Sequence, residues 1–183
     1  MSLGWDRIES PLGAVYIAAN ERGIVRVGVR CSEEEWRQTL TGLAPDSVRA
    51  AGDHPARRAA IQLAEYFAGR RHRFDLPLDL GDRTEFQRRA LAELAAIPFG
   101  CVTSYGELAA AVGRPRAARA IGGVMHQNPI PLILPCHRVV CSDGSLGGYA
   151  GGLGVKIHLL RHEGVSIAGD DPAGARVVRD RRR

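Results

Sequence analysis

The chain has 183 residues, a mass of 19.7 kDa and 45% hydrophobic residues, enough for one sizeable domain or two small ones. The formal net charge is +5, and the segment 176–183, with five Arg and one Asp, supplies +4 of it. A nucleic-acid surface on the nearly neutral remainder must therefore be a local patch. No apolar run approaches the ~20 residues of a membrane span, and the first residues lack the pattern of a secretory signal, so we expect a soluble, cytoplasmic protein without membrane association. Four unevenly spaced cysteines indicate reduced thiols rather than a disulfide framework.

The N-terminal part has the pattern of a small α/β domain. Alternating residues in 12–19 and 24–29 predict a β-hairpin. Ser32 and Glu35 form a capping box for a short helix to Leu40, and a second helix runs from about Asp53 to Gly69. The segment 73–80 alternates again, but Pro77 makes it an edge strand or a linker. We expect residues 1–83 to form a scaffold of a small sheet with helices, without a chemical site.

A new domain is predicted to begin at Thr84, which caps a helix reaching about Ile97. A second helix spans 105–112, and a third runs from Pro115 to about Gln127. The tight turn between them suggests a helix-turn-helix whose second helix carries Arg116 and Arg119 among small residues that could let it approach a DNA backbone. Such a helix could equally pack tightly on its own core. A last helix covers 153–163, so residues 84–169 are predicted to be mainly α-helical, and the Arg-rich tail 170–183 is expected to be disordered.

The segment PLILPCHRVV, residues 131–140, places Cys136 beside His137 at the end of an apolar run that resembles a buried strand. A cysteine there could simply be a small buried hydrophobic residue. As a nucleophile it would need a base, because the thiolate attacks and little of it is present at neutral pH. Adjacent residues on a strand point to opposite faces, so His137 would reach Cys136 only through a water or a bend in the chain.

Glu163 is the third candidate of this group. A carboxylate in the last turn of a helix is disfavoured by the helix dipole, unless a buried imidazole compensates it; the alternative is an exposed residue at a frayed helix end. The spacing CHRVVC fits no zinc-binding pattern, and His158 with His162 lacks the glutamate of HExxH. We therefore expect no metal.

With these residues considered, the chain resembles the O6-alkylguanine-DNA alkyltransferases, also called methylated-DNA–protein-cysteine methyltransferases. The resemblance extends from Thr84 to Gly164, and its core is NPIPLILPCHRVV followed by GYAGGLGVKIHLLRHEG. Residues 1–83 match loosely, through SPLGAVYIAA and GIVRVGV. Some relatives bind zinc in the N-terminal domain, but Cys31 is the only cysteine of that half here, so no zinc is expected there.

The resemblance implies direct repair of O6-alkylguanine, and of O4-alkylthymine, in double-stranded DNA by a monomer that needs no cofactor and is associated with the nucleoid in a prokaryote. Its implied catalytic residues are Cys136 as the alkyl acceptor, His137 acting through water, and Glu163 behind it. The implied DNA-binding residues are Tyr105 on a phosphate, Arg119 as the finger that replaces the flipped base, Asn128 as a hinge, Tyr149 in the base pocket, and Arg116 in the recognition helix. The transfer leaves a thioether, so each molecule repairs one lesion.

Two other functions remain open at this point. A binding module that marks alkylated bases for another pathway would bind lesions without gaining mass. A cysteine hydrolase would turn over many times.

Overall fold

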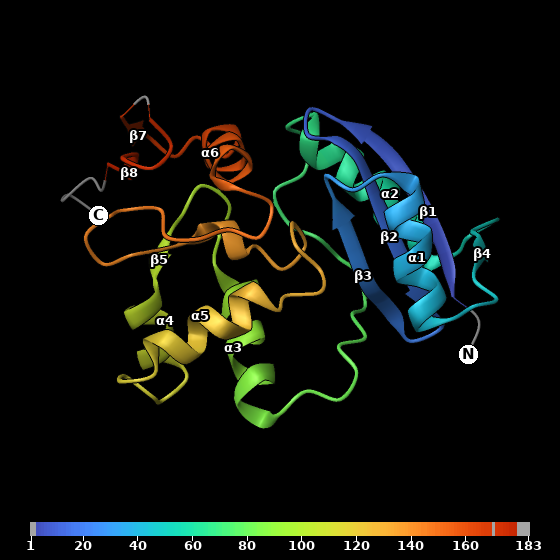
Figure 1. The fold of residues 1–183 in the computed structure, drawn as a ribbon, viewed down its shortest axis with the longest axis horizontal. Coiled ribbons are helices and arrows are strands. Elements are labelled where there is room, and N and C mark those ends of the chain that lie inside the picture. The colour runs from blue at the N-terminus through green and yellow to red at the C-terminus, as the bar shows by residue number, and fades with distance from the viewer. Residues whose placement is uncertain (1–2, 170, 179–183) are drawn as a thin grey trace. The chain divides into compact units, whose positions relative to one another are not determined.

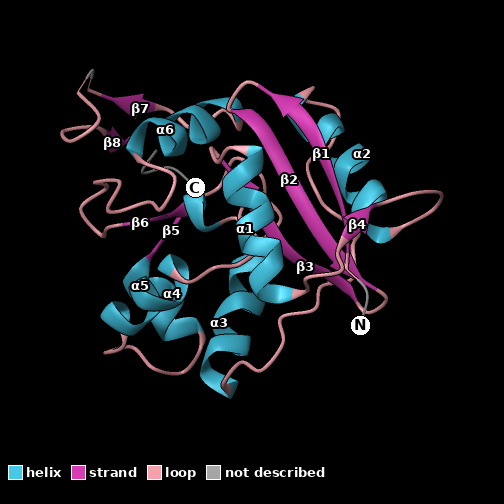
Figure 2. Cartoon of the chain, turned by 45° about the vertical axis from the view of Figure 1, so that its right-hand side comes forward, coloured by secondary structure: helices cyan, strands magenta, loops and turns pink. Residues whose placement is uncertain are grey.

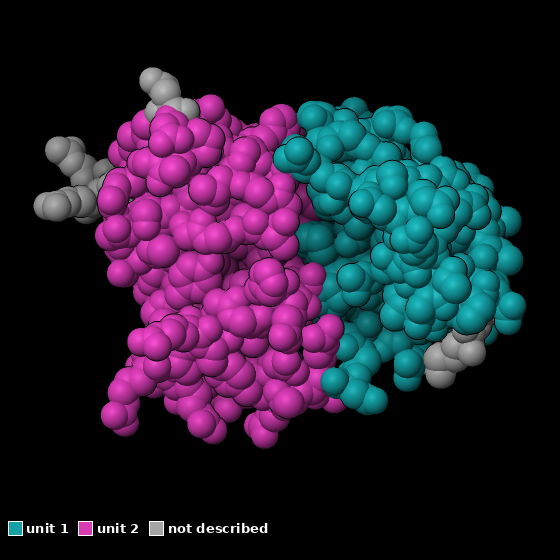
Figure 3. Space-filling view, in the orientation of Figure 1, with its two compact units in different colours: residues 1–82, 129–131 teal, residues 83–128, 132–183 magenta. Residues whose placement is uncertain are grey.

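The computed structural model describes residues 3–169 and 171–178, and these divide into two compact units (Figure 3). Unit 1 comprises residues 3–82 and 129–131, and unit 2 comprises residues 83–128, 132–169 and 171–178. The return of 129–131 to unit 1 was not predicted. The N–H of Val27 donates to the carbonyl of Pro129 at 2.9 Å and so adds this short segment to an edge strand.

Unit 1 is built on a four-stranded sheet with the order β3-β2-β1-β4 (Figure 1). Its strands are β1 (Gly4–Ser10), β2 (Gly13–Asn20), β3 (Gly23–Val29) and β4 (Val48–Arg49). β1, β2 and β3 pair in antiparallel fashion, and β4 runs parallel to β1. The predicted hairpin is confirmed as β2 and β3. β1 escaped prediction because its apolar residues Trp5 and Ile8 are three positions apart, which breaks the alternation that signals a strand.

Two helices cover opposite faces of this sheet, α1 (Glu33–Leu43) and α2 (Pro55–Phe67) (Figure 1). The capping box of Ser32 and Glu35 is present as predicted. Side chains on β2 alternate between the two faces, so Tyr16 meets α1 while its neighbour Ile17 faces α2. The α1 side forms one buried cluster, which contains Trp5, Tyr16, Ala18, Trp36 and Leu40.

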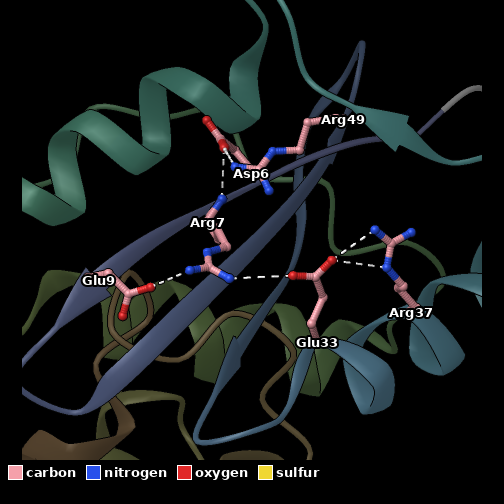
Figure 4. Close-up of polar contacts among 6 residues, drawn as sticks. All are labelled: Asp6, Arg7, Glu9, Glu33, Arg37 and Arg49. Carbon is pink, nitrogen blue, oxygen red and sulfur yellow. Dashed lines mark hydrogen bonds and ion pairs between the residues drawn. The ribbon is translucent and has the colours of Figure 1, made fainter.

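Ion pairs link β1 to α1 at the surface, as Figure 4 shows. Arg7 bonds Glu33 at 3.4 Å and Glu9 at 2.5 Å, and Glu33 also accepts from Arg37 at 2.8 Å. These side chains are at least 38% exposed, and solvent screens exposed ion pairs so that they contribute little to stability. The buried aromatic cluster therefore does more than the ion pairs to hold α1 on the sheet.

The segment 73–80 is a linker with one β-bridge, not a strand. The bridge joins Leu78 to Ile24 of β3, and the Ile24 N–H donates to the Pro77 carbonyl at 2.8 Å. Pro77 has no N–H to continue a ladder, which limits the pairing to this point. Of the two alternatives left open by the sequence, the linker is the one observed.

Unit 2 is mainly helical, and its strands are two short pairs of two residues each (Figure 2). Its helices are α3 (Glu85–Ala96), α4 (Tyr105–Ala111), α5 (Ala118–His126) and α6 (Leu153–His162), with one 3₁₀ turn, η1 (Cys136–Arg138). β5 (Thr103–Ser104) pairs with β6 (Val139–Val140), and β7 (Ile167–Ala168) pairs with β8 (Arg176–Val177). The capping boxes at Thr84 and Ser104 are confirmed. α5 begins at Ala118 and not at Pro115, because residues 114–117 form a turn closed by the Ala117 N–H on the Arg114 carbonyl at 2.8 Å.

The predicted disorder from residue 170 onward is wrong for residues 171–178. Ala175 and Val177 are buried in the core cluster of unit 2, and β8 pairs with β7. The high arginine content of this segment masked its two apolar residues in the sequence. They pack in a cluster that includes Leu160 of α6. Residues 170 and 179–183 of the predicted tail lie outside the described residues. Within the described ranges, no helix has the length and apolar character to cross a membrane.

Candidate functional site

The segment around Cys136 is not the strand that its apolar sequence predicted. Pro135 precedes the single turn η1, in which the Arg138 N–H donates to the Pro135 carbonyl at 2.9 Å. Only Val139 and Val140 continue as a strand. Proline fixes its own φ and cannot donate to a ladder, which favours a turn at this point. The turn supplies the bend that the sequence left open, and it directs Cys136 and His137 in different directions.

His137 and Glu163 lie together in the interior of unit 2. His137 is fully buried and Glu163 is 4% exposed, and the His137 Nε2 lies 2.7 Å from the Glu163 Oε1. Glu163 is the residue that ends α6, and the backbone N–H of Gly100 donates to its Oε2 at 3.2 Å. The alternative of an exposed glutamate at a frayed helix end is therefore wrong. The buried partners offset the unfavourable position at the helix C-terminus.

Arg138 completes this cluster, although it was not among the predicted site residues. Its Nε donates to the Glu163 Oε2 at 2.8 Å and its Nη2 to the Oε1 at 2.9 Å, a two-pronged ion pair. Its Nη1 donates to the Ile97 carbonyl at 2.6 Å. The guanidinium fork matches a carboxylate in this geometry, which permits burial of both charges.

The cluster sets the protonation states of its members. Burial alone would raise the pKa of Glu163, but hydrogen bonds from His137 and Arg138 outweigh it and lower the pKa to about 2. Burial lowers the pKa of His137, which keeps the imidazole neutral at pH 7. A neutral ring that donates from Nε2 to a carboxylate carries its lone pair on Nδ1. That Nδ1 has no hydrogen-bond partner among the described residues, so it is available to accept a proton.

Cys136 is only 8% exposed, and burial raises the pKa of its thiol. A hydrogen bond from Asn128 and the positive charge of Lys156 oppose this rise. Asn128 follows α5, and its Nδ2 also donates to the Leu134 carbonyl at 2.8 Å. This amide thus ties the end of α5 to the backbone just before Cys136. Asn128 is the residue for which the resemblance implied a hinge role.

Lys156 is a second residue near Cys136 that was not predicted. It is fully buried, and its Nζ donates to the carbonyls of Val139 and Leu146. Burial lowers its pKa to about 8. Lys156 and Glu163 are seven residues apart in the α6 region, and this spacing of two turns places both on one helical side. This spacing was the available sequence signal, but α6 also carries His158, Arg161 and His162, so the pair did not stand out.

A pocket of about 500 Å³ opens beside Cys136. Four segments supply its walls: the start of α4, the second half of α5, the turn η1, and the glycine-rich loop before α6. Its lining residues are Tyr105, Gly122, Met125, His126, Cys136, Gly148, Tyr149 and Ala150. The volume is typical of a site for an organic ligand, and the thiol lies in its wall.

Tyr105 and Tyr149 both line this pocket. Burial raises the pKa of both phenols, and the nearby cysteines raise it further. Both side chains are therefore protonated at neutral pH and present hydroxyl groups. Met125 and His126 were not predicted to line a site, because nothing in the local sequence distinguishes them from core and surface residues.

Arg116 and Arg119 are exposed and do not line the pocket. Arg116 lies in the turn before α5, and Arg119 lies in its first turn. Of the eight predicted site residues, six surround or support the pocket and these two lie on the surface of the same unit. Among the described residues there is no group of three or more His, Cys, Asp or Glu side chains arranged to hold a metal ion.

The chain matches two family models over most of its length. Residues 4–80 match the 6-O-methylguanine DNA methyltransferase ribonuclease-like domain, and residues 85–165 match the DNA binding domain of the same family. A relative from Methanosarcina barkeri, named methylated-DNA–protein-cysteine methyltransferase, is 38% identical over 159 residues, covering 87% of this chain and 96% of its own.

Solved structures show the same likeness. The crystal structure of a Mycobacterium tuberculosis O6-methylguanine methyltransferase has a TM-score of 0.74 and 36% identity, covering 92% of this chain and 96% of its own. A second structure from that organism, solved in complex with DNA, has a TM-score of 0.73 and 35% identity, covering 89% of this chain and 92% of its own.

Proposed function

The chain belongs to the 6-O-methylguanine DNA methyltransferase family, and from this premise we propose that Cys136 is the cysteine that accepts the alkyl group. Members of the family repair DNA by moving an alkyl group from a damaged base to a cysteine of the protein. The observation that carries the assignment is the position of Cys136. It is the one cysteine in the wall of the described pocket, and it adjoins the buried pair of His137 and Glu163.

The thiol is activated by His137 through a water molecule. The free Nδ1 accepts the proton, and the Glu163 carboxylate on Nε2 stabilises the imidazolium that results. Lys156 and Asn128 stabilise the thiolate at Cys136 by charge and by a hydrogen bond. This support is needed because the buried thiol holds its proton more tightly than an exposed one.

The transfer step is a direct displacement at the alkyl carbon. The thiolate forms a carbon–sulfur bond while the bond from that carbon to the O6 of guanine breaks, and the guanine takes up a proton. Overall the alkyl group moves to sulfur and a hydrogen moves to the base, so the reaction balances without a cofactor. A thioether does not reverse under these conditions, and each molecule therefore acts once.

DNA reaches the pocket by base flipping, because the damaged oxygen is inaccessible inside the base stack. Extrusion costs a few kcal/mol, less for a weakly paired lesion. α4 and α5 form a helix-turn-helix that binds the duplex, with Arg116 contacting it. Arg119 fills the gap that the base leaves, Tyr105 presses on the adjoining phosphate, and Tyr149 contacts the flipped base. In support, both arginines are exposed beside Ala118 and Ala120, small residues that permit close approach.

The substrates we propose are O6-alkylguanine and O4-alkylthymine in double-stranded DNA. Every proposed catalytic residue comes from unit 2 of one chain, so the protein acts as a monomer. All four cysteines are free thiols, which fits the reducing cytoplasm, where a prokaryotic nucleoid would hold the substrate.

A time course of lesion loss tests this function. With duplex DNA containing O6-methylguanine in tenfold excess, repair should stop after one equivalent of lesion per protein, because the acceptor is consumed. The measurement is the lesion content of the DNA together with the intact mass of the protein. Continued turnover would indicate a hydrolase, and lesion binding without any mass gain would indicate a recognition module.

Arg119→Ala should separate DNA delivery from chemistry. The rate of transfer from duplex DNA should fall about 10²-fold, since the vacated position in the base stack is no longer filled. Transfer from free O6-benzylguanine, which needs no base flipping, should stay within about twofold of the wild-type rate. Arg161→Ala, which removes an exposed arginine on α6, is the matched control. Equal losses on both substrates would contradict the finger role.

A further inference from the structure

The glycine-rich loop that carries Tyr149 has little structure of its own. Residues 141–152 contain no helix and no strand, and they connect β6 to α6. Gly147 and Gly152 have φ values of +66° and +88°. Backbone bonds within the loop close two turns, from the Cys141 N–H to the Ser145 carbonyl at 2.8 Å and from the Gly152 N–H to the Tyr149 carbonyl at 2.9 Å. Glycine at 147 and 148, between these turns, restricts the backbone very little, so contacts with other segments must fix how the two turns are placed.

The C-terminal hairpin supplies such contacts on the first half of the loop. The Val177 N–H donates to the Gly144 carbonyl at 2.9 Å, and Arg176 pairs with Ser145 in a β-bridge. Arg176 Nη1 also donates to the carbonyl of Asp143 at 3.1 Å and to its carboxylate at 3.0 Å. The approach is close enough that a Cβ on Gly144 would lie 3.1 Å from the Val177 carbonyl oxygen.

Buried apolar side chains reinforce this pairing. Val177 is 7% exposed and Ala175 is 1% exposed, and both belong to the core cluster that contains Leu146 of the loop and Val140 of β6. The ion pair of Arg176 and Asp143 is more than half exposed on both sides and so contributes little stability. The packed valine and the backbone bonds therefore make up most of the attachment.

The attachment lies close in sequence to the pocket. Leu146 is fixed by the cluster and by Lys156, and Tyr149 in the pocket wall follows three residues later. α6 begins at Leu153, so only residues 147–152 separate the fixed Leu146 from the helix. Residues 171–178 lie beyond the part of the chain that matches the DNA binding domain of the family, which ends at residue 165.

We propose that β8, through Arg176 and Val177, is a positioning element for the alkyl-transfer site. It holds the loop 143–146 so that Tyr149 forms a fixed wall for the base opposite Cys136. Arg176 and Val177 act through Tyr149 and touch no reacting atom. The inference rests on the proposed function of the pocket, and it assigns a role in that function to a segment outside the matched domain.

The test compares the double variant Arg176→Ala/Val177→Ala with a matched control variant in unit 1. That control is Arg26→Ala/Val27→Ala, which also removes one exposed arginine and truncates one buried valine on adjacent positions of a strand, β3 of unit 1. In the double variant, amide hydrogen exchange in residues 141–152 should accelerate about tenfold, while α3 stays at the wild-type rate. The transfer rate from free O6-benzylguanine should fall about tenfold, since a displaced pocket wall aligns the base poorly. The control should show neither change.

A Tyr149→Ala background tests whether the effect acts through Tyr149. There, adding Arg176→Ala/Val177→Ala should lower the transfer rate by less than about twofold, because coupled changes are not additive. The proposal is overturned by wild-type exchange rates in 141–152, by a transfer rate equal to that of the control, or by full additivity with Tyr149→Ala. The hydrogen exchange result does not depend on activity. Failure of the wild-type protein to alkylate Cys136 would refute the proposed function instead.

Discussion

Replacing Cys136 with alanine should abolish alkyl transfer completely. No other described cysteine lines the pocket, so no second acceptor can substitute. After incubation with a duplex containing O6-methylguanine, the wild-type mass should rise by one methylene group per molecule, and the variant mass should not change. The lesion should remain in the DNA.

Binding and folding should survive this substitution, which makes the loss specific. Affinity for the lesion duplex should stay within about twofold, because phosphate contacts supply much of the binding energy. The free energy of unfolding should change by about 1 kcal/mol, as the thiol is small. Cys141→Ala removes the thiol five residues further on and is the matched control, with full transfer expected. Label appearing on the Cys136→Ala protein would refute the assignment.

Replacing Glu163 with glutamine should produce the second largest effect, on both stability and rate. The variant leaves the buried Arg138 without its carboxylate, and removing one partner of a buried ion pair costs about 3–5 kcal/mol. Transfer should slow about 10²-fold, because an amide orients the His137 ring less well and no longer stabilises its charged form. Equilibrium unfolding in urea and single-turnover transfer measure the two effects. Glu93→Gln, an exposed position on α3, is the control.

The double variant Arg138→Met/Glu163→Gln separates the structural role of Glu163 from its catalytic role. Removing both charges leaves no unpaired ion, so much of the lost stability should return. Transfer should remain slow, since His137 still faces an amide. Recovery of the transfer rate together with stability would show that Glu163 acts on the fold alone.

The lowered pKa of Glu163 also leads us to expect that the free energy of unfolding falls in acid. Its pKa in the folded protein is about 2, below the ordinary value of 4.5, so the folded state resists its protonation. This contribution is fully present above pH 4.5 and is lost as the pH falls toward 2. It amounts to about 3 kcal/mol, and the difference in unfolding free energy between wild type and Glu163→Gln should shrink over this range. A difference that stays constant with pH would contradict it.

Local signals predicted the helices of this protein well. The capping boxes at Ser32, Thr84 and Ser104 begin helices in the structure, because a cap is satisfied by residues within four positions. β1 and β8 were missed because their own patterns are weak, although their antiparallel partners β2 and β7 are close in sequence. The turn at Cys136 was mistaken for a strand, since apolar content reports burial and not backbone conformation.

The candidate site also combines features that the local sequence predicts with features that it does not. Side-chain types alone identified the groups of Cys136, His137 and Glu163 that could attack, accept a proton or carry charge, and the ordered match from Thr84 to Gly164 indicated the family. The burial of Glu163 and its ion pair with Arg138 became visible only in the folded chain. The same holds for the hydrogen bond from Lys156 to the Val139 carbonyl and for the contact of β8 with the loop at Gly144. The hydrogen bonds of Arg138 and Lys156 join residues 17 to 41 positions apart. Distances across such separations are set by the packing of whole elements, which no local pattern encodes.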